Sequence, residues 1–241
     1  MMFKQKVSKG VILAAGDGSR LGSLTSSCPK VLLPVNDKPL IKYPIEALAA
    51  AGIREIAIVV GYLADKVVEA LGDGSCFGVD LQYIFNPDYH GGNAISVNKA
   101  RDWTQGDPTV LLMGDHLIER TSVKRLLKRT TSSDTLCIDC TPAKHCQLDE
   151  ASKVIIDNTG YIKDIGKDLI KWDAIDIGIF LLTKNFFQAL DELIPRLGTN
   201  IEINDVIQFL ISQGYHFETC DVSGSFWADV DTEEDLNTVR V

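Results

Sequence analysis

A glycine-rich turn that directly follows a short apolar run constrains this chain most. Residues 11–13 are VIL and residues 14–22 read AAGDGSRLG. The apolar run predicts the first strand of an α/β sheet, and the glycines let backbone N–H groups approach a phosphate without an obstructing Cβ. Arg20 on the turn and Lys30 further along could hold a polyphosphate from two sides. The stretch therefore indicates a site for a nucleoside triphosphate.

The turn fits neither of two common phosphate-binding loops. The dinucleotide fingerprint G-x-G-x-x-G would need glycines at 16, 18 and 21, but residue 21 is Leu21. A P-loop needs Gly-Lys followed by Ser or Thr, which the chain does not contain. A glycine-rich turn alone is also a common strand-to-helix connection. The phosphate interpretation therefore depends on Arg20 and on two later segments, Pro29-Lys30 and Leu33-Pro34-Val35.

Length and composition favour one ordinary globular domain. The chain has 241 residues, of which 45% are hydrophobic and 24% charged, and it shows no repeat, low-complexity tract or linker. We therefore expect a single domain over residues 1–241. No apolar stretch is long enough to span a membrane, and the first ten residues lack a signal-peptide core, so we expect a cytoplasmic protein without membrane insertion. The net charge of −9 argues against nucleic acid as a partner but not against a nucleotide.

The six cysteines are spread over the chain and do not resemble a disulfide framework. Cys137 and Cys140, with His145 and Cys146 nearby, could be interpreted as a zinc cluster. However, Cys137 lies in an apolar run typical of a strand, where neighbouring side chains point to opposite faces. We therefore expect structural thiols here.

Predicted strands and helices alternate through the first half of the chain. We expect strands at 10–15, 55–60, 79–85 and 109–113, and helices at 39–51, 63–71, 94–103 and 119–130. This alternation predicts a parallel sheet with right-handed crossovers. The second half is less regular. There we expect a hairpin of 153–157 and 161–165, strands at 175–182 and 215–220, and helices at 186–193, 202–213 and 233–239.

Asp115 is the first candidate metal ligand. It follows the apolar strand 109–113, at the carboxyl end where α/β sheets bind ligands. A triphosphate reaction requires Mg²⁺ to offset charge, and Mg²⁺ prefers carboxylates and water. The alternative is a Gly114-Asp115 turn that caps a following helix. The upstream loop favours the metal.

Asp229 and Asp231 form the second acidic candidate. In an extended chain they would lie on the same face, and carboxylates this close repel each other unless a cation lies between them. Alternatively, Asp231 or Thr232 caps the helix at 233–239, with Asp235 completing an imperfect capping box. Both can hold if Thr232 caps while the two aspartates bind metal.

Residues 89–96 are candidates for contact with the base. Gly91 and Gly92 would let the backbone approach a flat base, and Asn93 can both donate and accept hydrogen bonds. Ser96 would lie one turn further on the same side. Chemistry alone leaves an ordinary loop with Asn93 as helix N-cap equally open.

The acceptor phosphate requires a cation of its own. Lys167 follows a strand and a glycine, a position from which it could reach into a cleft, although it could equally be a solvated turn lysine. Asp176 on an otherwise apolar strand would suit the hydroxyls of a polyol. His116 could orient Asp115 from behind.

Several segments together resemble the sugar-phosphate nucleotidyltransferase superfamily. They are the LAAGDGSRL run, Pro29-Lys30, Leu33-Pro34-Val35 and the tryptophan-led acidic segment 227–232. The resemblance implies a Rossmann-like α/β/α sandwich with a mixed, mostly parallel sheet. It also implies an NTP at the carboxyl edge of this sheet, and metal roles for Asp115, Asp229 and Asp231.

Within the superfamily, segments 93–96, 113–116 and 227–232 are similar to CTP:inositol-1-phosphate cytidylyltransferases, relatives of the choline-phosphate cytidylyltransferases. The resemblance implies attack of a phosphate monoester on the CTP α-phosphate with loss of pyrophosphate, and Arg20, Lys30 and Asp115 as catalytic residues. Lys167 and Asp176 would bind the acceptor. The residues expected to bind nucleotide are Leu13, Ala14, Ala15, Gly16, Asp17, Gly18, Ser19, Gly61, Gly92, Asn93 and Ser96.

Three alternatives to this assignment stay open. The first is a hexose-1-phosphate enzyme that uses another NTP. The second is a choline-phosphate enzyme, which would need an aromatic cage for the quaternary ammonium of its substrate, such as Tyr161, Trp172 and Phe180. The third is a catalytically silent regulatory subunit of the same fold. A homodimer is one arrangement compatible with the chain. Many relatives are fused to a membrane-embedded transferase; the chain shows no such segment, so its product would pass to a separate polypeptide.

Overall fold

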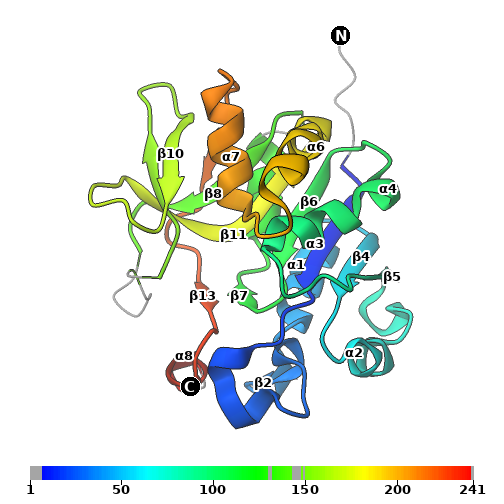
Figure 1. The fold of residues 1–241 in the computed structure, drawn as a ribbon. Helices are drawn as coiled ribbons and strands as arrows, with labels where there is room; N and C mark the ends of the chain where they lie inside the picture. Colours follow the sequence, from blue (N-terminus) through cyan, green and yellow to red (C-terminus); the bar gives the residue numbers. More distant parts are fainter. Residues whose placement is uncertain (1–6, 130–131, 143–147, 149, 240–241) are drawn as a thin grey trace.

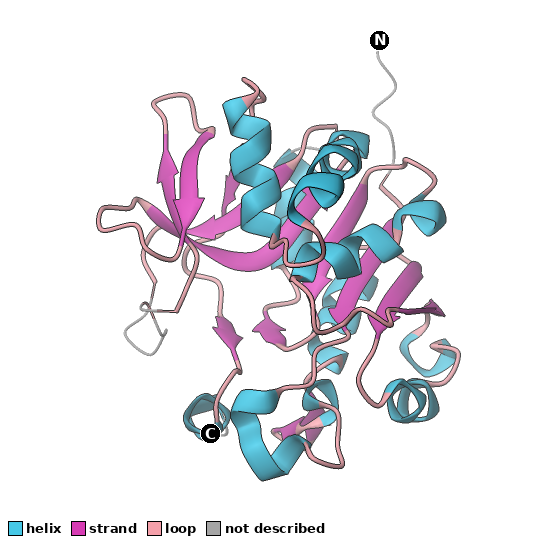
Figure 2. Cartoon of the chain, in the orientation of Figure 1, coloured by secondary structure: helices cyan, strands magenta, loops and turns pink. Residues whose placement is uncertain are grey.

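A nine-stranded mixed sheet forms the centre of the computed structural model, with helices on both of its faces (Figures 1 and 2). The structure describes residues 7–129, 132–142, 148 and 150–239. Its architecture confirms the predicted α/β class. None of the described helices is long and apolar enough to cross a bilayer.

The parallel half of the sheet comes from the first half of the chain. Strands β1 (Lys9–Ala14), β4 (Glu55–Val60), β5 (Asp80–Phe85) and β6 (Thr109–Met113) run in the order β6-β1-β4-β5. Every residue of β1 is buried, as expected for a strand covered on both faces. The helices between these strands are α1 (Lys42–Ala50), α2 (Ala64–Leu71), α3 (Asn93–Lys99) and α4 (Arg101–Thr104). The predicted alternation is confirmed in this half.

The antiparallel half is organised around the long strand β11 (Ala174–Leu182). Strand β8 (Thr135–Asp139) pairs along β11, β6 pairs with the end of β11, and β9 (Lys153–Ile156) pairs with its start. The predicted hairpin is present as β9 and β10 (Ile162–Gly166), which pair antiparallel. At the far edge, β12 (Glu218–Asp221) pairs parallel with β8. The strand expected at 215–220 is therefore shorter at its start.

Side chains of alternate strand residues pack into two separate cores, one on each face of the sheet. Ile12 packs with apolar residues of α1, α2 and α5 (Ser122–Arg129). Its neighbours Val11 and Leu13 pack with α3, α6 (Lys184–Leu197) and α7 (Ile203–Ser212) on the opposite face. This separation follows from the two-residue period of a strand.

A third, smaller core was not predicted from the sequence. It joins the 3₁₀ segment η1 (Ser19–Thr25), Leu33 just after the 3₁₀ segment η2 (Lys30–Leu32), and two short strand pairs to the C-terminal helix α8 (Glu233–Val239). One pair is β2 (Pro34–Val35) with β3 (Lys38–Pro39), which delays the start of α1 relative to the expected residue 39. The other pair is β7 (His116–Ile118) with β13 (Trp227–Asp229). This core brings η1, β7 and the C-terminal segment together, and β2 and α8 lie at the bottom of Figure 1.

The positions of Cys137 and Cys140 agree with the expectation that Cys137 lies in a strand. Cys137 is buried within β8 and lies in register with Cys220 of β12, whereas Cys140 is exposed just after β8. His145 and Cys146 of the alternative zinc cluster lie outside the described residues, as does the part of the chain next to them.

Asp134, the residue before β8, provides a test of the packing in the antiparallel half of the sheet. Its buried carboxylate accepts hydrogen bonds from Thr183 N at 2.6 Å, Thr183 Oγ1 at 2.7 Å and Tyr215 Oη at 2.8 Å. Asp134→Ala should lower the free energy of unfolding by about 2–4 kcal/mol, because it leaves buried donors unpaired. The exposed ion pair of Asp191 provides the control, and Asp191→Ala should cost at most ~1 kcal/mol in the same urea titration. Equal losses in the two variants would contradict the assigned role of Asp134.

Candidate active site

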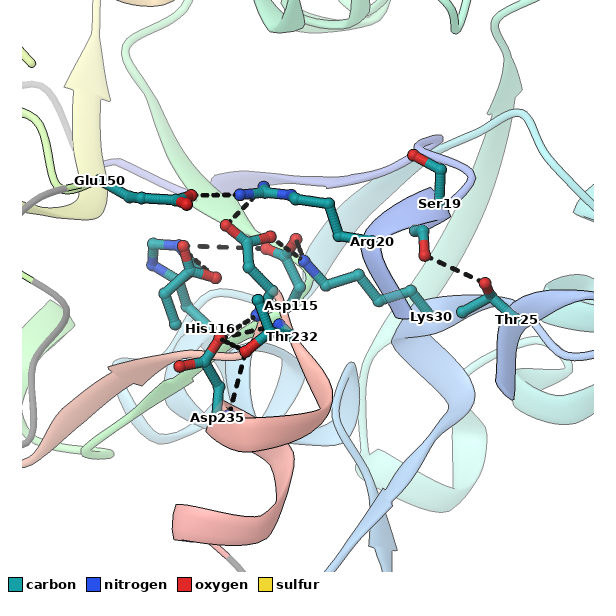
Figure 3. A network of polar contacts seen from close by, with 12 residues as sticks. Ser19, Arg20, Thr25, Lys30, Asp115, His116, Glu150, Thr232 and Asp235 are labelled. Carbon is teal, nitrogen blue, oxygen red and sulfur yellow. Dashed lines mark hydrogen bonds and ion pairs between the residues drawn. The ribbon is translucent and has the colours of Figure 1, made fainter. Parts of the chain in front are cut away.

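A cleft of about 630 Å³ opens at the carboxyl ends of β1 and β6. Its lining combines the glycine-rich loop, the segment after β6, the start of β11, the end of β10, the N-terminus of α7 and the acidic segment after β13. Parallel strands end here, so backbone and side chains from distant parts of the sequence meet at one edge of the sheet. Figure 3 shows the polar network on one side of this cleft.

Lys30 is buried at the centre of this network. Its Nζ lies 2.6 Å from Asp115 Oδ2 and 2.5 Å from Asp231 Oδ1, and its side chain is only 7% exposed (Figure 3). Burial alone would lower the pKa of this ammonium, but the surrounding carboxylates outweigh burial and raise the pKa above its ordinary value. Burial alone would raise the pKa of Asp231, but the nearby ammonium of Lys30 outweighs burial and lowers the pKa of Asp231 to about 2. Lys30 therefore stays charged and holds two acidic segments together.

Arg20 lies on the wall of the cleft, next to the ion pair of Lys30 and Asp231. Its guanidinium lies 2.6 Å from Asp231 Oδ2, also contacts Glu150, and is half exposed. The turn before it can pack this closely because residue 18 is glycine. Gly18 has a positive φ of 65°, and a Cβ there would lie 2.8 Å from the Cβ of Lys30.

Strand pairing places His116 and Asp229 opposite each other. In the β7–β13 ribbon Asp229 is in register with His116, the residue after Asp115. His116 Nε2 lies 3.4 Å from Asp229 Oδ1 and 4.0 Å from Asp115 Oδ1. Burial works against a charge on this imidazole, but the carboxylates of Asp229 and Asp115 outweigh it and raise the pKa of His116 to about 10. The next strand pair thus begins directly after Asp115, so the helix-capping alternative for this residue is wrong.

The acidic side chains divide into two groups. Donor atoms of Asp115, His116 and Asp229 lie within 4.8 Å of one another. Asp229 Oδ1 is buried and has no hydrogen-bond partner among the described residues. A buried carboxylate oxygen that accepts no hydrogen bond, with two further ligand atoms beside it, fits a divalent cation. Asp231 lies beyond the end of β13, where it is bound by Lys30 and Arg20 instead.

The C-terminal capping interpretation is confirmed. Thr232 Oγ1 accepts a hydrogen bond from Asp235 N at 3.2 Å, and Asp235 Oδ2 accepts from the backbone N–H groups of Asp231 and Thr232 (Figure 3). This reciprocal arrangement fixes the start of α8 directly after the acidic segment. Capping and the placement of Asp229 beside Asp115 therefore occur together.

The residues expected to bind nucleotide fall into two sets. Those on the cleft wall are Leu13, Ala15, Gly16, Asn93 and Ser96. Those not on the wall are Ala14, Asp17, Gly18, Ser19, Gly61 and Gly92. The last two glycines allow one segment of the chain to approach another. A Cβ at Gly61 would lie 2.7 Å from the Ala15 carbonyl oxygen, and one at Gly92 would lie 2.1 Å from the Ile201 carbonyl oxygen.

Asn93 and Ser96 already have partners in the protein. Asn93 Oδ1 accepts a hydrogen bond at 2.7 Å from the N–H of Ile203, the first residue of α7. Gly92, and not Asn93, occupies the N-cap position of α3, so the alternative role for Asn93 is wrong. Ser96 Oγ accepts from Asn86 Nδ2 at 2.9 Å. These bonds position the cleft wall between α3 and α7.

The two expected acceptor residues line the same cleft as the acidic cluster. Lys167 is exposed directly after β10. Asp176 accepts the Gly178 N–H at 2.7 Å, and burial outweighs this bond and raises the pKa of Asp176 to about 6. Sequence reasoning missed Ser152, Glu202 and Asn204, which also line the cleft. No local motif marks them, because only the fold of β9 and α7 brings them here.

Comparisons with known proteins identify the family of the chain. The model of the nucleotidyl transferase family matches residues 9–240, and the chain belongs to this family. It is similar over 98% of its length, with a TM-score of 0.83 and 26% identity, to a solved structure of the inositol-1-phosphate CTP transferase from T. maritima, 94% of which is covered.

Two curated relatives extend the comparison. The chain is 32% identical to a bifunctional IPC transferase and DIPP synthase of Rubrobacter xylanophilus, over 93% of this chain and 49% of the relative. It is 30% identical to a glucose-1-phosphate thymidylyltransferase of Streptomyces griseus, over 96% of this chain and 65% of the relative. The chain thus spans between about half and two thirds of the length of these relatives.

Removal of Lys30 should destabilise the fold in a pH-dependent way. Because the pKa of Asp231 is held at about 2, below the ~3.9 of an unfolded aspartate, its ionisation stabilises the fold above about pH 4. This stabilisation disappears as the pH falls through about 2. Lys30→Met should therefore cost about 2–4 kcal/mol at pH 7, and the difference from the unchanged protein should shrink below pH 4.

The measurement is denaturant unfolding at several pH values in the presence of a chelator. Lys171→Met, which replaces an exposed lysine outside the cleft lining, is the control. A cost for Lys30→Met that stays constant from pH 7 to pH 3 would contradict the charge-based account.

Proposed function

We propose that this chain transfers the cytidylyl group of CTP to the phosphate of inositol 1-phosphate, which yields CDP-inositol and pyrophosphate. The observation that carries the proposal is that Arg20, Asp115, Asp229, Lys167 and Asp176 line a single cleft. Lys30 is not on the cleft wall but is buried against Asp115. The printed names of the T. maritima structure and of the Rubrobacter relative support CTP and inositol 1-phosphate as the substrates.

The nucleotide side of the cleft supplies positive charge and backbone donors. Arg20 is half exposed on the cleft wall, so it can exchange its contact with Glu150 for a triphosphate oxygen. Lys30 uses two of its three N–H groups for described residues, Asp115 and Asp231. We assign its third N–H to the α-phosphate, where negative charge accumulates as pyrophosphate leaves.

The acidic cluster would hold Mg²⁺. Asp115 and Asp229 are its assigned ligands, and Asp231 remains beside them through Lys30 and Arg20. When bound, the cation neutralises phosphate charge and aligns the attacking and leaving oxygens. Ionised Asp115 suits this task, because Lys30 and His116 outweigh burial and lower its pKa.

On the acceptor side, Lys167 binds the phosphate monoester and Asp176 binds hydroxyls of the polyol. A phosphate oxygen forms the new bond to the α-phosphorus, and the bond to the β-phosphate oxygen breaks. The nucleophile is already an anion, so the reaction requires no general base and no covalent enzyme intermediate. The residues of the chain contribute position and charge neutralisation.

A sugar 1-phosphate with another NTP is the second candidate. It is supported by the thymidylyltransferase name of the Streptomyces relative, at similar identity to the Rubrobacter relative. The aromatic cage considered for choline phosphate receives no support from the geometry. Phe180 lines the cleft, whereas Tyr161 and Trp172 are not among its described lining residues.

A pyrophosphate-release screen tests the assignment. The protein is incubated with Mg²⁺, each of CTP, UTP, dTTP and GTP, and each of inositol 1-phosphate, glucose 1-phosphate and choline phosphate. We expect release with CTP and inositol 1-phosphate to exceed every other pair. A preference for dTTP with glucose 1-phosphate would select the second candidate, and no release with any pair would favour a silent regulatory subunit.

Asp115→Asn should reduce kcat by roughly 10²–10⁴-fold, because it removes the charge that faces the proposed cation. The variant should retain the far-UV circular dichroism of the unchanged protein. Asp191→Asn, an exposed aspartate of α6, is the matched control and should retain full activity. Near-normal turnover of Asp115→Asn would remove Asp115 from the mechanism.

Lys167→Ala should raise KM for the phosphorylated acceptor roughly 10–100-fold and leave KM for CTP unchanged, because one charged hydrogen bond to the acceptor is lost. Lys171→Ala removes a nearby exposed lysine that does not line the cleft and should change neither constant. An increase in KM for CTP alone would place Lys167 on the nucleotide instead.

A further inference from the structure

We propose that His116 Nε2 is a ligand of the divalent cation, together with Asp115 and Asp229. The centre would then be a mixed imidazole–carboxylate site, which binds Mn²⁺ and similar metals in preference to Mg²⁺. This inference deepens the proposed function and rests on it for the presence of a cation. Four features of the described residues support it.

The first feature is the strand register. The β7–β13 ribbon places His116 directly opposite Asp229, and chain connectivity places it next to Asp115. Side chains of an antiparallel pair that lie opposite each other have their Cβ atoms about 5 Å apart on one face. Three metal-binding side chains are thereby held by one short ribbon and one strand end. This degree of backbone control is typical of a preorganised site.

The second feature is a β-bulge in β11 that fixes the imidazole. The register of β11 against β8 shifts between Asp176 and Phe180, and Gly178 adopts a positive φ of 74° there. The carbonyl of Ile177 faces His116 Nδ1 at 3.1 Å. A carbonyl can only accept, so Nδ1 carries a proton in either charge state of the ring, and a metal ion would replace the proton on Nε2. Histidines that bind metal usually donate their other ring N–H to such a carbonyl.

The third feature is the orientation of Asp115. Lys30 binds its Oδ2, whereas its Oδ1 lies on the side of His116 Nε2, at 4.0 Å. His116 Nε2 lies 3.4 Å from Asp229 Oδ1. Two ligands that each lie about 2.1 Å from one ion can be separated by at most ~4.2 Å, and both separations fall within this limit. The 4.0 Å separation is too long for a hydrogen bond.

The fourth feature is the unsatisfied oxygen of Asp229. Its Oδ1 is buried and accepts no hydrogen bond among the described residues. Its ion pair with His116 Nε2, at 3.4 Å, supplies charge but no hydrogen bond, and a buried carboxylate oxygen in this state is costly unless a ligand completes it. Gly178 keeps the space beside the imidazole open, since a Cβ at this position would lie 2.4 Å from His116 Nδ1.

Imidazole in the ligand set has a consequence for metal choice. Mg²⁺ and Mn²⁺ both accept carboxylate and water, whereas imidazole is a ligand of transition metals and suits Mg²⁺ poorly. The site should therefore bind Mn²⁺ more tightly than Mg²⁺, and part of this preference should be lost when His116 is removed. The preference is a property of binding and is measurable without any turnover.

The test uses Mn²⁺ as a paramagnetic probe of the full chain. Electron spin-echo spectroscopy of the Mn²⁺-loaded protein should show coupling to an imidazole ¹⁴N, replaced by ¹⁵N coupling when histidine is isotopically labelled. His116→Asn should abolish this coupling, weaken Mn²⁺ binding at least about tenfold by titration calorimetry, and change Mg²⁺ binding less. His216→Asn is the matched control, because this ring packs on Tyr161 and does not line the cleft.

A second variant acts on the position of the ring. Gly178→Ala should weaken the ¹⁴N coupling through displacement of the imidazole, while thermal unfolding reports whether the fold is retained. Bound Mn²⁺ whose signal lacks ¹⁴N coupling in the unchanged protein, but disappears in Asp115→Asn, would overturn the inference. The site would then be formed by carboxylates and water, with His116 as an ion-pair partner.

The outcomes separate this inference from the proposed function. Nitrogen coupling without pyrophosphate release from any substrate pair would retain the metal site and remove the assigned reaction. Pyrophosphate release with CTP and inositol 1-phosphate but without nitrogen coupling would retain the reaction and remove His116 from the metal. Coupling that persists in His116→Asn would also overturn the inference, because another nitrogen would then be the ligand.

Discussion

The rest of the site depends on the ion pairs that the buried ammonium of Lys30 forms. This ammonium binds Asp115 from the end of β6 and Asp231 from the C-terminal segment, both within 2.6 Å. An ion pair of this kind contributes most when it is desolvated and fully hydrogen-bonded, and its loss leaves buried negative charge without compensation. Three segments that are far apart in the sequence are thus fixed around one positive charge.

The fold provides the frame for this charge. The parallel strands β1 and β6 end side by side, so the glycine-rich loop and Asp115 emerge at one edge of the sheet. A small core around Leu21, Leu117 and Leu236 then fastens the loop, β7 and α8 to one another. Asp229 reaches the site because β13 pairs with β7. The acidic cluster is therefore as much a product of apolar packing as of charge.

Local sequence patterns predicted the sheet and the position of the glycine-rich loop well. The strands at 55–60 and 109–113 have the expected bounds, because long apolar runs bounded by turn residues identify buried strands. Gly16 of the glycine-rich turn and Arg20 line the cleft after β1, a position that follows from consecutive residues directly after an apolar strand.

The features that were missed depend on contacts between distant segments. The β7–β13 ribbon consists of two strands of three residues each, too short for any periodicity to appear. Its register alone places His116 opposite Asp229, and it separates Asp229 from Asp231. The glycines at 61 and 92 looked like ligand contacts in the sequence, yet their lack of a Cβ serves the close approach of two chain segments. Such roles follow from tertiary packing, which a local pattern does not contain.

Arg20, Lys30 and the carboxylates of Asp115 and Asp229 are proposed to act on one triphosphate. A crystal structure with a non-hydrolysable CTP analogue and a divalent cation tests this most directly. The account predicts the α-phosphate between Lys30 and the Asp115–Asp229 pair, with Arg20 released from Glu150 onto the triphosphate. A nucleotide bound elsewhere, with Lys30 and the carboxylates turned away from its phosphates, would contradict the account.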